Sequence, residues 1–148
     1  MRDSSVPTEV KDPVAEARRY VQNAKDVLQK ADLNTETQLY RDPKYVRMAG
    51  NTLWNGVLVI LEAVFQVTDN NKTRPHFSDY QRAIAQRDYK LLDFVTTGYN
   101  VMHLSMGYDG NRAKSTCQDG FRLANEIIDR CAAMLNKSKI VFNEKGFN

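Results

Sequence analysis

The sequence lacks the local motifs by which many enzyme sites are recognised. It has no glycine-rich phosphate loop, no CxxC pair, no HExxH and no GxSxG. The two histidines, His76 and His103, are too few for a histidine-rich metal site. Neither follows a glutamate by three residues, as a ferritin-like di-metal centre requires. We therefore expect no metal and no cofactor.

Cysteine is also scarce. Cys117 and Cys131 fall on one predicted helix, which would separate them by roughly 21 Å and so prevent a disulfide between them. Both lie on an apolar helix face, which favours packed, reduced thiols over a nucleophile. Reduced thiols and a polar N-terminus without an apolar signal region predict a cytoplasmic protein.

The sequence also has no large excess of charge of one sign and no long apolar run. The net charge of +3 is too small to require a nucleic-acid partner. The longest unbroken apolar run, Val57–Leu61, is far shorter than the roughly 18 residues that a membrane span needs, so we expect no membrane association. A chain of 148 residues with 42% apolar content predicts one globular domain, residues 1–148, with tails at 1–11 and 137–148.

The stretch Asp42–Val67 predicts a long buried helix at the centre of the fold. Asp42 can accept hydrogen bonds from the free N–H groups of the first turn, and Pro43 needs no donor there. Apolar residues then recur at helical spacing and widen until the C-terminal half is apolar on almost every side. The residues that hold this spacing are Val46, Ala49, Leu53, Val57, Ile60 and Val64.

The N-terminal part predicts a helix that pairs with this central one. Asp12 and Pro13 repeat the same start signal, and the short polar link Asp32–Arg41 favours a helical hairpin. Apolar residues alternate three- and four-residue steps, which makes a packing seam for an antiparallel neighbour. The seam consists of Val14, Ala17, Val21, Ala24, Leu28 and Ala31.

A short helix and a long one follow the central helix. Ser78 and Gln81 form a capping-box pattern that opens the short helix near residue 79. This helix continues, or kinks near Asp88, into a helix at Tyr89–Met106. Gly107 suits the left-handed residue that closes a helix.

The last long helix is expected to begin near Ser115, with Gln118 as its capping partner. Its seam consists of Cys117, Phe121, Ala124, Ile128, Cys131 and Leu135. The sequence has no convincing strand. The predicted fold is therefore all-α, an up-and-down bundle of four long helices plus one short helix.

Two aromatic residues and two glycines of the central helix give packing expectations. Trp54 and Phe65 should be largely buried. Gly50 and Gly56 each cost roughly 1 kcal/mol against alanine inside a helix, which indicates that other helices cross close to them.

Polar residues at steps of four, four and seven residues form a strip on one side of the central helix. The strip consists of Arg47, Asn51, Asn55 and Glu62. One interpretation is a solvated edge whose members form a hydrogen-bond ladder. The other is the floor of a ligand groove.

The segment Tyr99–Gly110 is the second candidate site. His103 lies one turn after Tyr99, and Tyr108 and Asp109 follow at the helix end. A histidine in a last helical turn is favoured by the carbonyl dipole, which can explain it without any function. The alternative is catalytic, with Asp109 orienting the His103 ring for proton transfer.

Basic residues near helix ends are the third candidate. Lys44, Lys72 and Arg74 are interleaved with aromatics, as in proteins that bind phosphates of single-stranded nucleic acid. Balancing acidic residues favour a solvated surface instead.

Two runs, KYVRMAGNTLWNGVL at 44–58 and LSMGYDG at 104–110, resemble a family of small bacterial helical proteins of unassigned function, over most of residues 13–136. The ARRYVQNAKDVL opening and the long second helix are similar in layout to HEPN domains. Those are helical bundles, often dimeric, found in nuclease toxins, antitoxin systems and nucleotidyltransferase partners. HEPN ribonucleases carry an arginine and a histidine with four to six residues between them, and residues 96–99 before His103 include no arginine. The resemblance thus implies a bundle and a pairing surface, without the ribonuclease motif.

We predict a non-catalytic HEPN-like bundle that acts by binding, as a homodimer, with another protein or a nucleic acid as further partners to test. The main alternative is a divergent HEPN-type nuclease or nucleotide-binding protein with a cleft between the second and fourth helices. That cleft would consist of Arg47, Asn51, Asn55, Tyr99, His103, Tyr108 and Asp109. Phosphate contacts would come from Lys44, Lys72 and Arg74.

Overall fold

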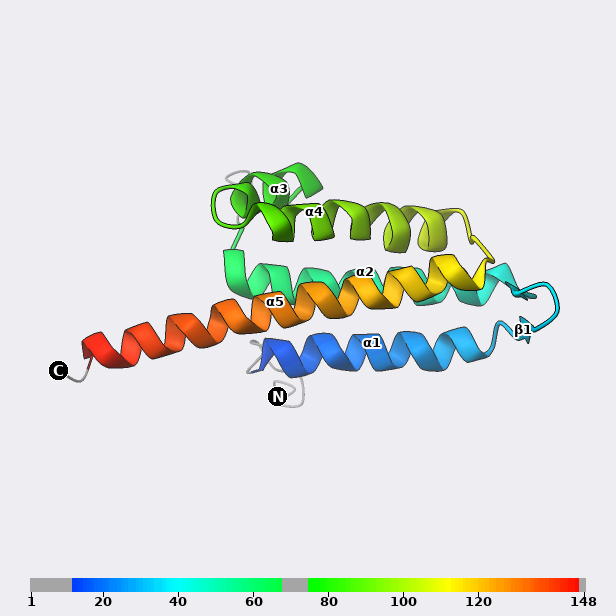
Figure 1. The fold of residues 1–148 in the computed structure, drawn as a ribbon, viewed down its shortest axis with the longest axis horizontal. Coiled ribbons are helices and arrows are strands. Elements are labelled where there is room, and N and C mark those ends of the chain that lie inside the picture. The colour runs from blue at the N-terminus through cyan, green and yellow to red at the C-terminus, as the bar shows by residue number, and fades with distance from the viewer. Residues whose placement is uncertain (1–11, 68–74, 147–148) are drawn as a thin grey trace, which may run out of the picture.

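Long helices run alternately up and down and form a bundle (Figure 1). The computed structural model describes residues 12–67 and 75–146, with side chains as far as residue 138. The helices are α1 (Pro13–Gln29), α2 (Pro43–Phe65), α3 (Phe77–Ala85), α4 (Tyr89–Gly98), the π-helix η1 (Tyr99–Tyr108) and α5 (Lys114–Gly146). This architecture confirms the predicted all-α bundle.

The two Asp-Pro signals start helices as predicted. The Asp12 carboxylate accepts a hydrogen bond from the Ala15 N–H at 3.0 Å, and the Asp42 carboxylate accepts one from the Lys44 N–H at 2.9 Å. Each proline occupies the first helical position. These caps depend only on neighbours in the sequence, so the sequence was sufficient to locate them.

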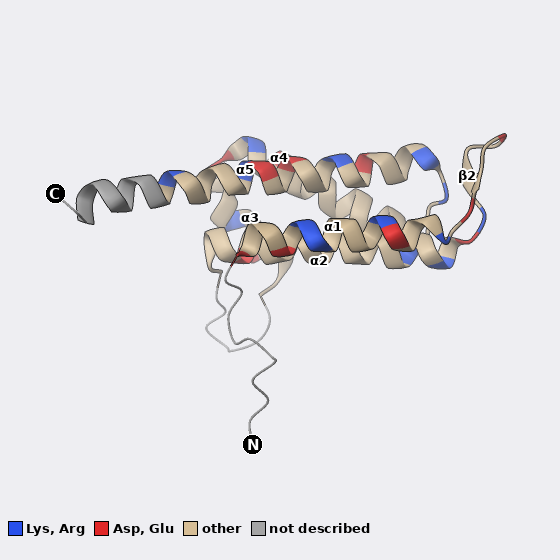
Figure 2. Ribbon diagram, turned by 90° about the horizontal axis from the view of Figure 1, so that it is seen from below, with Lys and Arg blue, Asp and Glu red and all other residues tan. Residues whose placement is uncertain are grey.

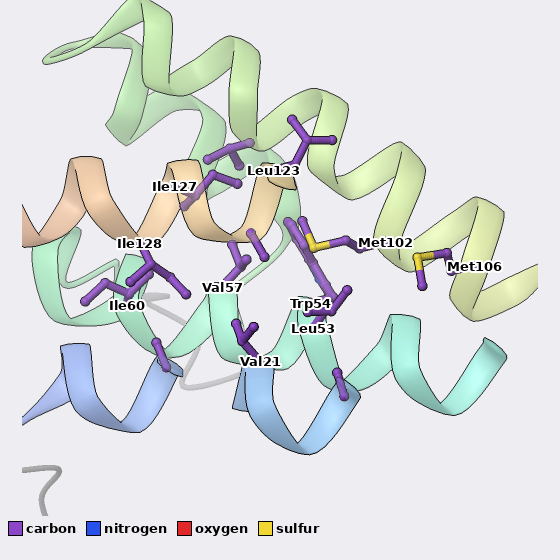
Figure 3. Packing of buried hydrophobic residues seen from close by; sticks show 14 of the residues in the cluster. Val21, Leu53, Trp54, Val57, Ile60, Met102, Met106, Leu123, Ile127 and Ile128 are labelled. Carbon is purple, nitrogen blue, oxygen red and sulfur yellow. The ribbon is translucent and has the colours of Figure 1, made fainter. Parts of the chain in front are cut away.

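The core forms around α2, which contacts α1, α3, η1 and α5. Figure 3 shows side chains from α1, α2, η1 and α5 meeting in one cluster, among them Val21, Leu53, Val57, Met102, Ile127 and Ile128. By length and mean hydropathy alone, α2 could cross a membrane. Its contacts on several sides are those of the core helix of a bundle.

The link between α1 and α2 is a small β-hairpin, which the sequence analysis missed. Strands β1 (Leu33–Asn34) and β2 (Leu39–Tyr40) pair antiparallel. The segment before α5 extends this pairing: the Tyr40 N–H donates to the Arg112 carbonyl at 2.8 Å, and the Lys114 N–H donates to the Gln38 carbonyl at 3.0 Å. The strands are too short to show the alternating pattern that identifies a strand.

The predicted capping box at Ser78 and Gln81 is wrong. Helix α3 begins earlier, at Phe77, and the Asp79 carboxylate accepts a hydrogen bond from the His76 backbone N–H at 2.9 Å. An aspartate three residues after the cap position fulfils the role that glutamate or glutamine has in the usual pattern. The predicted kink near Asp88 is present, since α3 ends at Ala85 and Asp88 caps α4.

Asp88 also joins this junction to α5. Its carboxylate accepts a hydrogen bond from the Leu91 N–H at 3.0 Å and two from the Arg130 guanidinium, at 2.7 and 3.1 Å. The hydrogen bonds from Arg130 hold the pKa of Asp88 below its usual value, against the opposing effect of burial. The carboxylate therefore stabilises the fold when it is ionised.

Asp88→Asn is expected to lower the free energy of unfolding by about 1–2 kcal/mol at pH 7, because the amide keeps the cap but loses the charged pair. A lowered folded-state pKa means that this stabilisation is present above the unfolded pKa of about 4 and is lost as the pH falls through the folded value. Urea unfolding at pH 7 and at pH 3 measures it. A difference between the two proteins that stays as large at pH 3 would contradict this assignment.

The helix predicted to end at Met106 continues as η1 to Tyr108, and Gly107 does not close it in a left-handed conformation. The left-handed residue is Gly110, with φ +66°. Gly107 is buried, and a Cβ there would collide with the Asn51 Oδ1 atom. Its lack of a side chain thus serves a close contact with α2.

Helix α5 begins at Lys114, so Ser115 lies inside it and the predicted Ser115–Gln118 capping box is wrong. Pairing of residues 112–114 with β2 fixes the helix start. Besides the predicted seam, Leu123 and Ile127 are buried, because α5 packs on α4 and η1 as well as on α2. The helix continues to Gly146, past the ends of α1 and α2 (Figure 1).

The two central glycines lie at close helix contacts, as predicted. A Cβ at Gly56 would lie 2.6 Å from the Tyr20 Cβ of α1. Trp54 is buried as expected, at 5% exposure. The expectation that Phe65 is largely buried is wrong, because it is only half-buried at the end of α2, with the Arg87 guanidinium 5.1 Å from its ring centroid.

Candidate functional site

The first candidate, the polar strip of α2, holds the end of η1. The Arg47 Nε donates to the Tyr108 carbonyl at 3.3 Å, and its Nη2 lies 3.5 Å from the Asp109 carbonyl. The Asn51 amide donates to the Gly107 carbonyl at 3.3 Å. The last carbonyls of a helix have no partner within it, so these side chains satisfy groups that would otherwise need water.

The rest of the strip does not join this arrangement. Asn55 and Glu62 are exposed, and no side-chain hydrogen bond links strip members within the described part of the chain. The predicted hydrogen-bond ladder is therefore not formed there. Arg47 and Asn51 are structural partners of η1.

The second candidate, His103, lies in an aromatic cluster between α2, α3 and η1. Phe77 and Tyr99 stack with ring centroids 4.1 Å apart, and Trp54 meets Tyr99 edge-on at 5.4 Å. The His103 ring centroid is 5.2 Å from that of Tyr99. The Nδ1 atom of His103 is buried and has no hydrogen-bond partner in the described structure. Asp109 thus does not orient this ring as a general base requires.

The structure brings the two candidate sites to the same boundary, where α2 meets η1. At its centre, a Cβ on Gly50 would lie 2.5 Å from the Met102 carbonyl oxygen and from the Met106 Cβ. Helices this close leave no room for a ligand between them. The α2–η1 boundary is thus a packed contact around Gly50.

The predicted phosphate contacts are only partly described. Lys44 is exposed, with its ammonium 4.6 Å from the Tyr45 ring centroid, while Lys72 and Arg74 lie outside the described residues. Basic and acidic residues are interspersed along the helices (Figure 2). Such a mixture favours the solvated-surface interpretation.

The two cysteines are buried, as predicted. Burial raises the pKa of Cys117 to about 11 and that of Cys131 to about 12. Both thiols are therefore protonated at neutral pH. They lack the thiolate character of a nucleophile.

A stripe of exposed residues runs along the outer side of α4 and η1, opposite its buried side. We call it the outer stripe; it consists of Tyr89, Asp93, Thr97, Asn100, Leu104 and Tyr108. Tyr89 is 75% exposed, Tyr108 77% and Leu104 37%. Tyr89 lies at one end of the stripe and Leu104 and Tyr108 at the other, with the polar residues between them. Exposed large apolar side chains framed by polar residues can mark an interaction surface. Tyr108 was predicted to line a cleft, whereas the stripe was not predicted, although its steps of three and four residues are visible in the sequence.

A pocket of about 410 Å³ opens where α1, the β-hairpin and α5 meet. It is lined by Lys25, Leu28, Gln29, Leu33, Tyr40 and Phe121. None of the residues predicted for the cleft belongs to it. The sequence assigned Leu28 and Phe121 to packing seams, and nothing in their spacing indicated a pocket.

Comparisons with known proteins give a family and a fold. The family model described as a domain of unknown function, DUF5618, matches residues 12–133. A solved structure described as a protein of unknown function from Dyadobacter fermentans is 36% identical, with a TM-score of 0.74, over 83% of this chain and 95% of that chain. No curated protein matches the chain. The matched region includes α2, η1 and the outer stripe.

Proposed function

This chain belongs to the DUF5618 family, as its predicted resemblance to uncharacterised bacterial helical proteins implied, and from that premise we propose that it is a non-catalytic bundle that acts by binding, as a homodimer. The outer stripe of α4 and η1 is the dimer contact. The observation that carries the proposal is the exposure of three large apolar side chains, Tyr89, Leu104 and Tyr108, on that stripe.

The ends of the outer stripe complement each other in a two-fold arrangement. Lys90 follows Tyr89 at one end, and Asp109 follows Tyr108 at the other; both charged residues are exposed. In an antiparallel pairing about an axis near Thr97, the Tyr89 end of one copy meets the Tyr108 end of the other. Each lysine then lies opposite an aspartate of the second copy. The same pairing buries four tyrosine rings, two from each copy, and tyrosine is enriched in such contacts.

Several features support binding over catalysis. His103 lies among aromatic rings with no base or acid on its Nδ1, and Arg47 is engaged with carbonyls of η1. The two buried, protonated thiols suit a reducing compartment, which is consistent with a cytoplasmic location. The antiparallel pairing of α1 with the long α2 supports the proposed likeness to HEPN domains.

Sedimentation equilibrium of the full chain tests the proposal. We expect a mass of twice the 17.0 kDa chain at micromolar concentration. Lys90→Glu alone and Asp109→Lys alone should each raise the dimer dissociation constant about tenfold, because each places like charges together at both ends of the contact. The double variant Lys90→Glu/Asp109→Lys should restore the wild-type value, since the opposite charges face each other again.

Met48→Ser is the matched control, because Met48 is 47% exposed on α2 and lies outside the outer stripe. It should leave the dissociation constant unchanged. A monomer at every concentration, or a double variant that is weaker than both single variants, would overturn the proposed dimer.

A further inference from the structure

The pocket between α1, the β-hairpin and α5 has an apolar floor and a polar edge. Leu28 is buried, and Leu33 and Phe121 are half-buried around it. Lys25 and Gln29, one helical turn apart on α1, are exposed. Tyr40 of β2 adds an aromatic ring with a hydroxyl group. A volume of about 410 Å³ lies within the range of pockets that hold small organic ligands.

Lys25 is a cation without a carboxylate partner in the described structure. Nearby carboxylates are engaged elsewhere: Asp26 accepts a hydrogen bond from Gln22 at 3.0 Å, and Asp32 pairs with Arg41 at 3.0 Å. No acidic residue lines the pocket. The lining therefore carries a net positive charge beside an apolar floor.

Tyr40 can act as a hydrogen-bond donor at the same edge. Burial raises the pKa of its phenol above the ordinary value, with a smaller effect from Cys117, so the hydroxyl keeps its proton at neutral pH. Its backbone is fixed, since the Tyr40 N–H donates to the Arg112 carbonyl and the Arg112 Nε donates to the Tyr40 carbonyl at 2.6 Å. The phenol is thus presented from a fixed strand, as a preformed site requires.

We propose that this pocket binds an amphipathic carboxylate: a small acid whose apolar body lies on Leu28, Leu33 and Phe121 and whose carboxylate pairs with Lys25. Tyr40 donates a second hydrogen bond to the carboxylate, and Gln29 lies at the open edge. The apolar body supplies affinity through burial, and the charged hydrogen bond from Lys25 selects an anion over a neutral compound of the same length.

The pocket uses no residue of the outer stripe, so this inference does not rest on the proposed dimer. If the dimer test fails, the ligand proposal still stands, and the reverse also holds. Loss of dimer in sedimentation and loss of ligand in titration are separate measurements on the same protein.

Titration of the ¹⁵N-labelled full chain with sodium octanoate, followed by NMR, tests the inference. We expect shifts confined to α1 after residue 24, the hairpin and the start of α5. Octan-1-ol, which has the same apolar body without the charge, should bind about tenfold more weakly. Sodium acetate, which has the charge without the body, should cause no comparable shifts.

Three variants locate the charge and the donor. Lys25→Gln should weaken octanoate binding about tenfold and leave octan-1-ol binding unchanged, and Tyr40→Phe should weaken octanoate binding several-fold. Lys30→Gln is the matched control, because Lys30 is an exposed lysine at the C-terminal end of α1 that does not line the pocket. Equal loss in the Lys25 and Lys30 variants, shifts centred on another surface, or no saturation at millimolar octanoate would overturn the proposal.

Discussion

Trp54→Ala is expected to lower the free energy of unfolding by about 3–5 kcal/mol, the usual cost of removing a buried aromatic ring. Trp54 is 5% exposed and belongs to the buried cluster (Figure 3). It touches three other rings, with Phe77 at 5.6 Å and Tyr99 at 5.4 Å in edge-on contacts. Its loss would leave a cavity between α2, α3 and η1. Neither η1 nor α3 can close that cavity without giving up its other contacts.

Circular dichroism at 222 nm during urea unfolding measures this effect, since the variant removes the chain's one tryptophan and with it the fluorescence signal. The melting temperature should fall by roughly 10 °C. Met48→Ala, a truncation at an exposed site of the same helix, should change stability by about 0.5 kcal/mol or less. A loss under 1 kcal/mol for Trp54→Ala would show that the ring is not part of the core.

Parts of the fold that depend on neighbours in the sequence could be predicted, whereas parts that depend on distant partners could not. The caps at Asp12 and Asp42 are local, and both were predicted correctly. The hairpin β1–β2 was missed because residues 112–114 extend its pairing from far along the chain. The start of α5 at Lys114 was predicted to within one residue, but its capping box was wrong because pairing with β2 sets that start.

The π-helix η1 was not predicted, because a segment of ten residues is too short for its wider turns to leave a distinct pattern of apolar residues. In the structure, Gly98, Met102 and Met106 are buried at steps of four. A segment with i→i+5 hydrogen bonds has more residues per turn and accommodates such steps. What stabilises its end is remote, since Arg47 and Asn51 come from α2. Long-range capping of this kind has no local signature.

The candidate site residues were identified one segment at a time, and only the structure shows whether they form a ligand site or a packing contact. Arg47 and Asn51 do approach the segment that contains His103, as the cleft interpretation supposed. The two helices are in direct contact, however, so no space remains between these residues for a ligand. The pocket was not predicted because Lys25, Tyr40 and Phe121 come from three segments, each of which looks ordinary alone.

Gly50→Ala is expected to destabilise the protein by about 3 kcal/mol although it adds one methyl group and improves helix propensity. The new Cβ would lie 2.5 Å from the Met102 carbonyl oxygen and 2.7 Å from the Gly107 backbone nitrogen. Backbone atoms cannot avoid the new methyl group by rotating as a side chain can, so α2 and η1 must separate. Their separation would also lengthen the hydrogen bond from Asn51 to the Gly107 carbonyl, which is already 3.3 Å.

Gly98→Ala is the matched comparison, because Gly98 is also buried in a helix but faces movable atoms. Its Cβ would lie 2.7 Å from the Met102 Cε and 3.3 Å from the Ile127 Cδ1, both at the tips of flexible side chains. The gain in helix propensity, about 1 kcal/mol, can then offset the local adjustment. We expect a change within about 1 kcal/mol of zero in urea unfolding, against the large loss at Gly50. Equal effects at the two sites would contradict the view that backbone contact between α2 and η1 holds this side of the bundle closed.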